Sequence, residues 1–199
     1  MNNDYLGIKI LLGLATAIIF IVVHFSANYL AKIRNAKRCL KSGWDDKIPF
    51  VPFMIYFYLF TYIFNTVCLF LMIYSKPINE FVIVVKMMLA LIFIGGGFYI
   101  FFPTVIKKPI FEDKGGISLK LVKLHNDRIL PYNALPSLHV AFSLITVLVS
   151  FYYNFYLRFV YLILLILILI SALLTKQHYI IDIIAGLAVG SFIYIIFGM

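Results

Sequence analysis

Residues 176–182 contain a histidine and an aspartate at a spacing that supports chemistry. His178 and Asp182 are four residues apart, so in a helix their side chains lie one turn apart on the same face. A carboxylate in that position can hold an imidazole in one tautomer, which prepares the ring to act as a nucleophile or a base. Because a carboxylate beside an apolar run is costly to bury, we expect a functional pair here and not a charge near a helix end that only reaches for solvent.

A second histidine lies where another apolar run begins. Residues 133–139 read Asn-Ala-Leu-Pro-Ser-Leu-His, and a proline followed by a serine able to cap is typical of a helix start. Free backbone N–H groups and the positive dipole end make such a start a natural phosphate site. His139 alone would more often be only hydrogen-bonded. It becomes a candidate because His139 and His178 open helices entered from the same side, so one ring can attack while the other donates a proton.

The composition defines the class of protein that positions these rings. Of 199 residues, 64% are hydrophobic and only 13% are charged, and the mean hydropathy is +1.04. A water-soluble domain of this length does not show these values, so the sequence predicts an integral membrane protein. Two separated cysteines, Cys39 and Cys68, form no recognisable framework. The net charge of +9 sits in a few polar segments, which indicates membrane orientation and phosphate attraction, and no nucleic-acid module is present.

Six segments meet or approach the roughly twenty apolar residues that cross a bilayer, and they predict an all-α bundle of six transmembrane helices in one domain. Their approximate ranges are 10–31, 51–74, 81–102, 137–155, 159–175 and 179–198. Glycines at 95–97 and at 186 and 190 predict close packing of helix backbones. With six crossings, the polar segments 32–49 and 103–136 and the turn at Lys176 lie on one side of the membrane.

The sequence motifs resemble those of a known family. Pro136-Ser137-Leu138-His139, followed by Ser171, His178 and Asp182, is similar to the second and third signatures of the type 2 phosphatidic acid phosphatase (PAP2) superfamily. The versions Asn-x-x-Pro-Ser-Leu-His and Thr-Lys-Gln-His-Tyr resemble the bacterial branch related to sphingomyelin and inositol phosphorylceramide synthases. The resemblance covers about residues 102–190.

The resemblance implies a membrane enzyme that works without a metal or another cofactor. His178 would be the nucleophile that forms a phosphohistidine, and Asp182 would orient it. His139 would protonate the leaving alkoxide, and Ser137 would bind the phosphate. The substrate would be a phospholipid or a prenyl diphosphate in the bilayer.

The sequence departs from the family pattern at two basic positions. The nearest match to the first signature is Lys108 followed by proline, with Phe101 at the position of the family's lysine, and Ala172 replaces the arginine of the third signature. Arginine binds phosphate with a two-pronged fork that lysine lacks. We therefore expect Lys108, Lys176 and Arg128 to supply the missing positive charge.

Basic residues give conflicting indications of sidedness. Thirteen Lys and Arg residues lie on the side of the histidines and four lie opposite, which by the positive-inside rule would place the site in the cytoplasm. Basic residues that bind phosphate bias this count, and without the two loops that flank the histidines it is six against four. The family resemblance implies the outer face of the cell membrane, which we adopt as the expectation.

Three functions remain open from the sequence. The leading one is a phosphatase that hydrolyses a lipid phosphomonoester or diphosphate through a phosphohistidine. The second is a phosphotransferase that uses the same histidines to move a lipid headgroup to an alcohol. The third is a transporter or scaffold without enzymatic activity.

Overall fold

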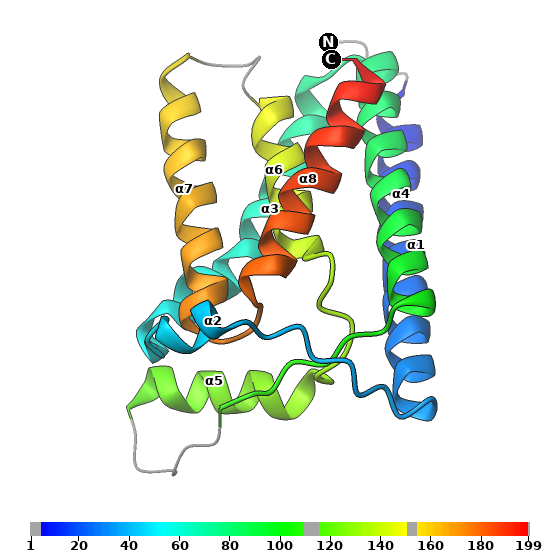
Figure 1. Cartoon of the computed structure of the whole chain (residues 1–199). Helices are drawn as coiled ribbons and strands as arrows, with labels where there is room; N and C mark the ends of the chain where they lie inside the picture. Colours follow the sequence, from blue (N-terminus) through cyan, green and yellow to red (C-terminus); the bar gives the residue numbers. More distant parts are fainter. Residues whose placement is uncertain (1–4, 110–115, 151–154, 199) are drawn as a thin grey trace.

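The computed structural model describes residues 5–109, 116–150 and 155–198, and this part of the chain is helical apart from loops and one isolated bridge between Val105 and Tyr132 (Figure 1). Its elements, in chain order, are α1 (Leu6–Ile33), α2 (Gly43–Lys47), the 3-10 turn η2 (Pro52–Met54), α3 (Ile55–Ser75), α4 (Ile78–Phe101), α5 (Ile117–Arg128), α6 (Leu138–Ser150), α7 (Phe155–Leu174) and α8 (Ile180–Phe197).

Four helical segments in the described part are long and apolar enough to cross a membrane, so the protein is a membrane protein. They are Leu6–Ile33, Pro52–Ser75, Ile78–Phe101 and Ile180–Phe197. Two further apolar helices are shorter: α6 has 13 residues, and the described side chains of α7 start at Arg158. Residues 151–154 of the predicted span 137–155 and residues 110–115 of the predicted polar segment 103–136 lie outside the described residues.

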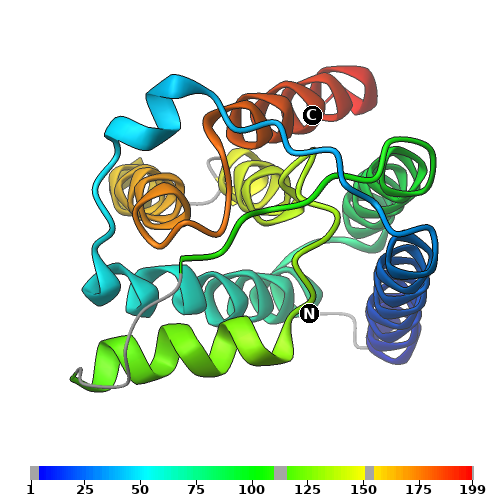
Figure 2. The ribbon, with the colours of Figure 1, turned by 60° about the horizontal axis from the view of Figure 1, so that its bottom comes forward.

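The long helices run side by side, with α6 and α8 adjacent near the centre and α1 and α4 paired along one edge (Figure 1). At the end where α6 and α8 begin, α5 lies across the bundle against η2 and the start of α3, and α2 lies on the opposite side of α7 (Figure 2). The sequence did not predict α5 as a helix. This helix buries Val122 against Ile55 and Tyr58, whereas Ile117 and Leu124 on its other faces are exposed.

Glycines let α8 approach α6 at the level of Ser137, which confirms the predicted close packing. A methyl group at Gly186 would stand 2.6 Å from the carbonyl oxygen of Ser137, and one at Gly190 would stand 3.2 Å from that of Ala141. In α4, a methyl group at Gly95 would meet the side chain of Leu138. The first turn of α6 is therefore held between α8 and α4, at contacts that admit no added side chain.

Replacing Gly186 with alanine is expected to damage both stability and activity. The clash is with backbone, which cannot rotate away, so α8 must move from α6; overpacking of this kind costs about 1–3 kcal/mol. Thermal unfolding in detergent and turnover would both be measured. The matched control is Gly97→Ala on α4, since an added methyl there has no neighbour within 4 Å. Equal behaviour of the two variants would contradict the packing argument.

Candidate active site

A tight turn between α7 and α8 fixes the position of His178. The carbonyl oxygen of Ala172 accepts hydrogen bonds from the backbone N–H groups of Gln177 (3.0 Å) and His178 (3.2 Å). Between Ala172 and Gln177, Lys176 adopts a φ of 56°, in the left-handed region that reverses the chain within a few residues. The imidazole of His178 is 8% exposed, so the turn delivers it to the interior of the bundle end.

Asp182 lies in the first turn of α8, directly beside this imidazole. Its Oδ2 accepts a hydrogen bond from the backbone N–H of Tyr179 (2.8 Å) and stands 3.6 Å from Nδ1 of His178. The carboxylate is 1% exposed. Catalytic hydrogen bonds are often long in a site without substrate, so this distance is compatible with a carboxylate that holds the proton on Nδ1. The lone pair of the ring is then on Nε2, the atom that faces α6.

The start of α6 meets that atom. The backbone N–H of Ser137 donates to the carbonyl oxygen of Asp182 (3.0 Å), and Oγ of Ser137 lies 3.1 Å from Nε2 of His178. These two contacts tie the beginning of α6 to the beginning of α8. Ser137 is fully buried, so its hydroxyl is directed to the histidine and not to solvent.

The structure brings the second histidine to the same place. The ring centroids of His139 and His178 are 5.8 Å apart. Two tyrosines of α3 hold the His139 ring: Tyr58 and Tyr62 have centroids 5.2 Å and 5.1 Å away, and the hydroxyl of Tyr62 is 2.8 Å from Nε2 of His139. The two imidazoles therefore approach one small volume from different helices.

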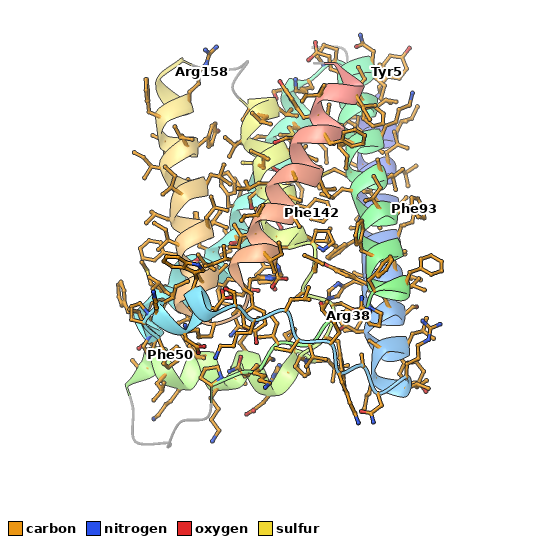
Figure 3. All side chains as sticks on the ribbon, viewed as in Figure 1. Tyr5, Arg38, Phe50, Phe93, Phe142 and Arg158 are labelled. Carbon is orange, nitrogen blue, oxygen red and sulfur yellow. The ribbon has the colours of Figure 1, made fainter. Side chains whose placement is uncertain are left out.

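Both histidines line a cavity of about 440 Å³. It extends from the bundle end between α1, α3, α4 and α6, and its wall away from the histidines is mostly apolar. In Figure 3, Phe142 of α6 points into the interior of the bundle, whereas Phe93 of α4 points outward. Phe142 lines the cavity and contacts Phe20 of α1 edge-on.

Two of the three predicted cations line this cavity, Lys108 and Arg128. Nζ of Lys108 donates to the carbonyl oxygens of Asn126 (3.0 Å) and Ile129 (2.5 Å) at the end of α5. Burial lowers the pKa of Lys108 to about 8, against the opposing effect of Asp127. Because an ammonium group has three protons, two carbonyl partners leave one proton for a phosphate.

The structure does not bring Lys176 to the cavity. Its Nζ donates to the carbonyl oxygens of Asp45 (2.8 Å) and Ile48 (2.5 Å), in and just after α2. The side chain of Lys176 is thus directed to the segment around α2 and not to the cavity. Lys176 therefore attaches the segment around α2 to the turn that holds the histidine.

The structure also shows the surroundings of Phe101 and Ala172, which stand where the family pattern has a lysine and an arginine. Ala172 is fully buried in an apolar cluster with Tyr58 and Val140, which leaves no space for an arginine. Phe101 is 77% exposed at the end of α4 and does not line the cavity. Among the described residues that line the cavity, the Lys and Arg side chains are those of Lys108, which precedes α5, and Arg128, the last residue of α5.

A distant carboxylate supports the start of α8. Oδ1 of Asp45 accepts a hydrogen bond from the backbone N–H of Ile180 (2.9 Å), and Oδ2 accepts from both the N–H and the hydroxyl of Ser42. Burial opposes ionisation of Asp45, but these hydrogen bonds and Lys176 outweigh it and hold its pKa below the usual value. An ionised carboxylate at a helix start is favourable, so Asp45 stabilises the turn that carries His178 and Asp182.

Several residues of the site could not be recognised in the sequence. Tyr58 and Tyr62 belong to a uniformly apolar run, in which only their phenol groups differ from their neighbours. His125 lies in the polar segment 103–136, in which no motif marks it. It is on α5 against Tyr58, with ring centroids 5.3 Å apart, and lines the cavity. Burial, followed by the charge of Lys108, lowers the pKa of His125 to about 4, so its ring is neutral at pH 7.

The fold and the site define a class of protein: a helical membrane protein with two adjacent histidines at the polar end of an apolar cavity, as suits a membrane phosphoesterase. Comparison with protein families agrees. A model of the PAP2 superfamily matches residues 35–196, which is most of the chain, so the protein belongs to this superfamily of phosphoesterases. Searches of curated proteins and of solved structures gave no match.

Proposed function

We propose that the protein is a membrane lipid phosphatase that hydrolyses a lipid phosphomonoester or diphosphate through a phosphohistidine. The observation that supports this most directly is the 5.8 Å separation of the His139 and His178 rings at the end of an apolar cavity. At that separation, one phosphorus atom and its leaving oxygen fit between a nucleophile and a proton donor.

In the first step, Nε2 of His178 attacks phosphorus while the bond from phosphorus to the lipid oxygen breaks. Asp182 stabilises the positive charge that develops on the imidazole, since its carboxylate lies beside Nδ1. His139 gives its proton to the leaving alkoxide, which departs as the lipid alcohol. The hydroxyl of Ser137, now bonded to His178, can turn to donate to a phosphate oxygen.

In the second step, water attacks the phosphohistidine. The neutral His139 removes a proton from this water, the bond between phosphorus and Nε2 breaks, and inorganic phosphate leaves. Both rings return to their starting states. Lys108 and Arg128 stabilise the negative charge on the transferring oxygens in both steps.

The cavity also suits the apolar chain of a lipid. It follows about four turns of α1, from Asn28 to Gly13, which is roughly 22 Å. At its far end α1 and α3 are joined, because Nζ of Lys9 donates to the carbonyl oxygens of Ile73 (2.7 Å) and Lys76 (2.9 Å). Nearer the histidines, Phe25 and Tyr62 both line the cavity and are exposed, so we place sideways access from the bilayer between α1 and α3.

The decisive test of this function is a substrate panel with product identification. Purified protein would be incubated with radiolabelled phosphatidic acid, a prenyl diphosphate and a phosphodiester lipid. We expect free phosphate from one or both of the first two substrates. If none of the three is converted under conditions where the protein is folded, the enzymatic proposal is wrong.

The pH dependence of substrate binding is expected to report on Lys108. With a pKa of about 8, its ammonium is charged below that pH and neutral above it, so KM should rise as the pH increases through 8. In Lys108→Arg the charge persists, and KM should no longer rise. Loss of the charge in Lys108→Met should raise KM by roughly tenfold or more, as expected for a charge-assisted hydrogen bond.

The matched control for this experiment is Lys107→Arg. Lys107 is the exposed neighbour of Lys108 and does not line the cavity. This variant should keep the wild-type pH profile. A profile that is unchanged in Lys108→Arg would remove Lys108 from phosphate binding.

The membrane topology of this proposal is six crossings, by α1, α3, α4, α6, α7 and α8, with the histidines at the extracytoplasmic face of the cell membrane. A cysteine introduced for Lys120, which is exposed on α5, tests the orientation in a background where Cys39 and Cys68 are replaced. An impermeant thiol reagent should label it in intact cells. A cysteine at Asn79, exposed at the opposite end of the bundle, should be protected; the reverse result would place the site in the cytoplasm.

A further inference from the structure

A group of unpartnered polar side chains lines the cavity beside the two catalytic candidates. His24 and Asn28 of α1 and Asn133, which precedes α6, line the cavity and have buried side-chain atoms without a hydrogen-bond partner. The same holds for Thr61 and Asn65 of α3 and for Nδ1 of His178. Asn28 is 5% exposed and Asn133 is 4% exposed. Buried polar groups are normally satisfied, so such a group on a cavity wall indicates a missing partner.

The hydrogen bonds on α1 determine what that partner must offer. Nδ2 of Asn28 donates to the carbonyl oxygen of His24 (2.9 Å) and lies 3.1 Å from Nε2 of the same histidine. A carbonyl only accepts, so the bonded end of the Asn28 amide is its nitrogen, and the unpartnered end is the acceptor Oδ1. Nε2 of His24 then accepts from the amide, and the neutral ring has its proton on Nδ1, which is an unpartnered donor.

Asn133 adds a second donor and a second acceptor. Its backbone is fixed, because its N–H donates to the carbonyl oxygen of Thr104 (2.9 Å) and its φ is 62°. Both Nδ2 and Oδ1 of its side chain lack a partner. These three residues, from α1 and from the segment before α6, therefore leave donors and acceptors unused around one cavity, to which Thr61 and Asn65 of α3 add further unpartnered oxygens.

This group borders the reacting end of the cavity. The ring of His24 lies 6.1 Å from that of Tyr99, centroid to centroid, and the hydroxyl of Tyr99 donates to the carbonyl oxygen of Pro136 (2.8 Å). Pro136 immediately precedes Ser137. Contacts thus connect His24 of α1, through Tyr99, to Pro136, and the next residue, Ser137, contacts His178.

We propose that His24, Asn28 and Asn133 form a subsite for the hydroxyl groups of a polyol. A phosphate dianion only accepts hydrogen bonds and would leave Oδ1 of Asn28 unpaired. A quaternary ammonium group neither donates nor accepts, and the described residues that line the cavity include no Asp or Glu to balance its charge. A hydroxyl group both donates and accepts, so a polyol satisfies the donors and the acceptors together.

The proposal rests on the proposed function, because it places a polyol next to the phosphohistidine. The polyol can be a free alcohol that replaces water as the phosphate acceptor, or the headgroup of a phosphodiester lipid. The second source would make the protein a headgroup phosphotransferase.

The test compares two variants with one control. Asn28→Leu keeps the approximate size without the amide, and Asn133→Gly removes the side chain where glycine tolerates the backbone. Thr16→Val is the control, since Thr16 also lines the cavity but its hydroxyl is already bonded to Leu12. Each protein is given labelled phosphatidic acid, with and without glycerol, and separately phosphatidylglycerol.

In wild type and in Thr16→Val, glycerol should divert phosphate into glycerol phosphate, or phosphatidylglycerol should be turned over. In the two asparagine variants the ratio of glycerol phosphate to free phosphate should fall at least tenfold, or KM for phosphatidylglycerol should rise at least tenfold. Free phosphate release without glycerol should change less than twofold. The first effect identifies a free acceptor and the second a lipid headgroup.

Unchanged ratios and KM values would overturn the subsite, because the polar groups would then bind only water. A variant that loses phosphate release without glycerol would also overturn it, since its side chain would serve the fold or hydrolysis itself. Absence of phosphate release in the wild type is a separate result that removes the proposed function.

Discussion

Replacement of His178 by alanine is expected to abolish phosphate release and to eliminate the phosphoenzyme. No other group in the described part of the site combines an imidazole nitrogen with an adjacent carboxylate, as His178 does with Asp182 at 3.6 Å. Removal of a nucleophile from a catalytic unit costs about 10⁴-fold or more in kcat. The measurement is acid-labile incorporation of labelled phosphate from a lipid substrate after rapid quenching, together with steady-state turnover.

The control for this prediction is His125→Ala. His125 lines the same cavity but sits on α5, with its ring against Tyr58. Its low pKa leaves it uncharged at pH 7. This variant should still form the phosphoenzyme. A labelled intermediate that survives in His178→Ala and disappears in His125→Ala would make His125 on α5 the nucleophile and contradict the mechanism.

The apolar runs predicted the long helices because a segment in lipid must satisfy its backbone hydrogen bonds within a helix and present apolar side chains to the hydrocarbon. The helices α1, α3, α4, α6, α7 and α8 occupy the six predicted runs, and membership of the superfamily is confirmed. The structure also places His139 and His178 together, at the starts of two helices. The sequence could place these two histidines at helix starts because each lies where a polar segment changes to an apolar run.

Composition could not predict α5 or the contacts of Lys176. Residues 103–136 are polar overall, and a short helix that lies across the end of a bundle gains its stability from tertiary contacts such as that of Val122 with Ile55. Lys176 is two residues from His178 in the chain, but its ammonium donates to the carbonyl oxygen of Asp45. The path of the turn and the position of the segment around α2 determine this contact, and a pattern of residue types reports neither.

The polar wall of the cavity was hidden for a different reason. His24, Asn28 and Asn65 are isolated polar residues in long apolar runs, where a polar side chain often only bonds its own helix. Asn65 is satisfied at one end only: its Nδ2 donates to Oγ of Ser143 on α6, whereas its Oδ1, like that of Asn28, has no partner. Only the packing of α1 against α4, and the resulting cavity, shows that His24 and Asn28 retain unused hydrogen-bonding atoms.

Replacement of His139 by alanine is expected to slow the enzyme in a way that depends on the leaving group. A lipid alkoxide is a strong base, and it leaves phosphorus readily only if a proton reaches it in the transition state. Loss of a general acid costs about 10²–10⁴-fold. An aryl phosphate with an acidic phenol leaves without that proton, so its conversion to the phosphoenzyme should be nearly normal.

The comparison uses single-turnover rates of phosphoenzyme formation, which exclude the second step, where His139 acts as the base. Tyr62→Phe is the matched control. It removes the hydroxyl that lies 2.8 Å from Nε2 of His139 but keeps the ring that packs on the imidazole. Its effect should be smaller than that of His139→Ala and should follow the same dependence on the leaving group, because the tyrosine acts only through the histidine. If His139→Ala slows the aryl phosphate as much as the lipid, His139 binds the phosphate or supports the site, and the proton must come from another group.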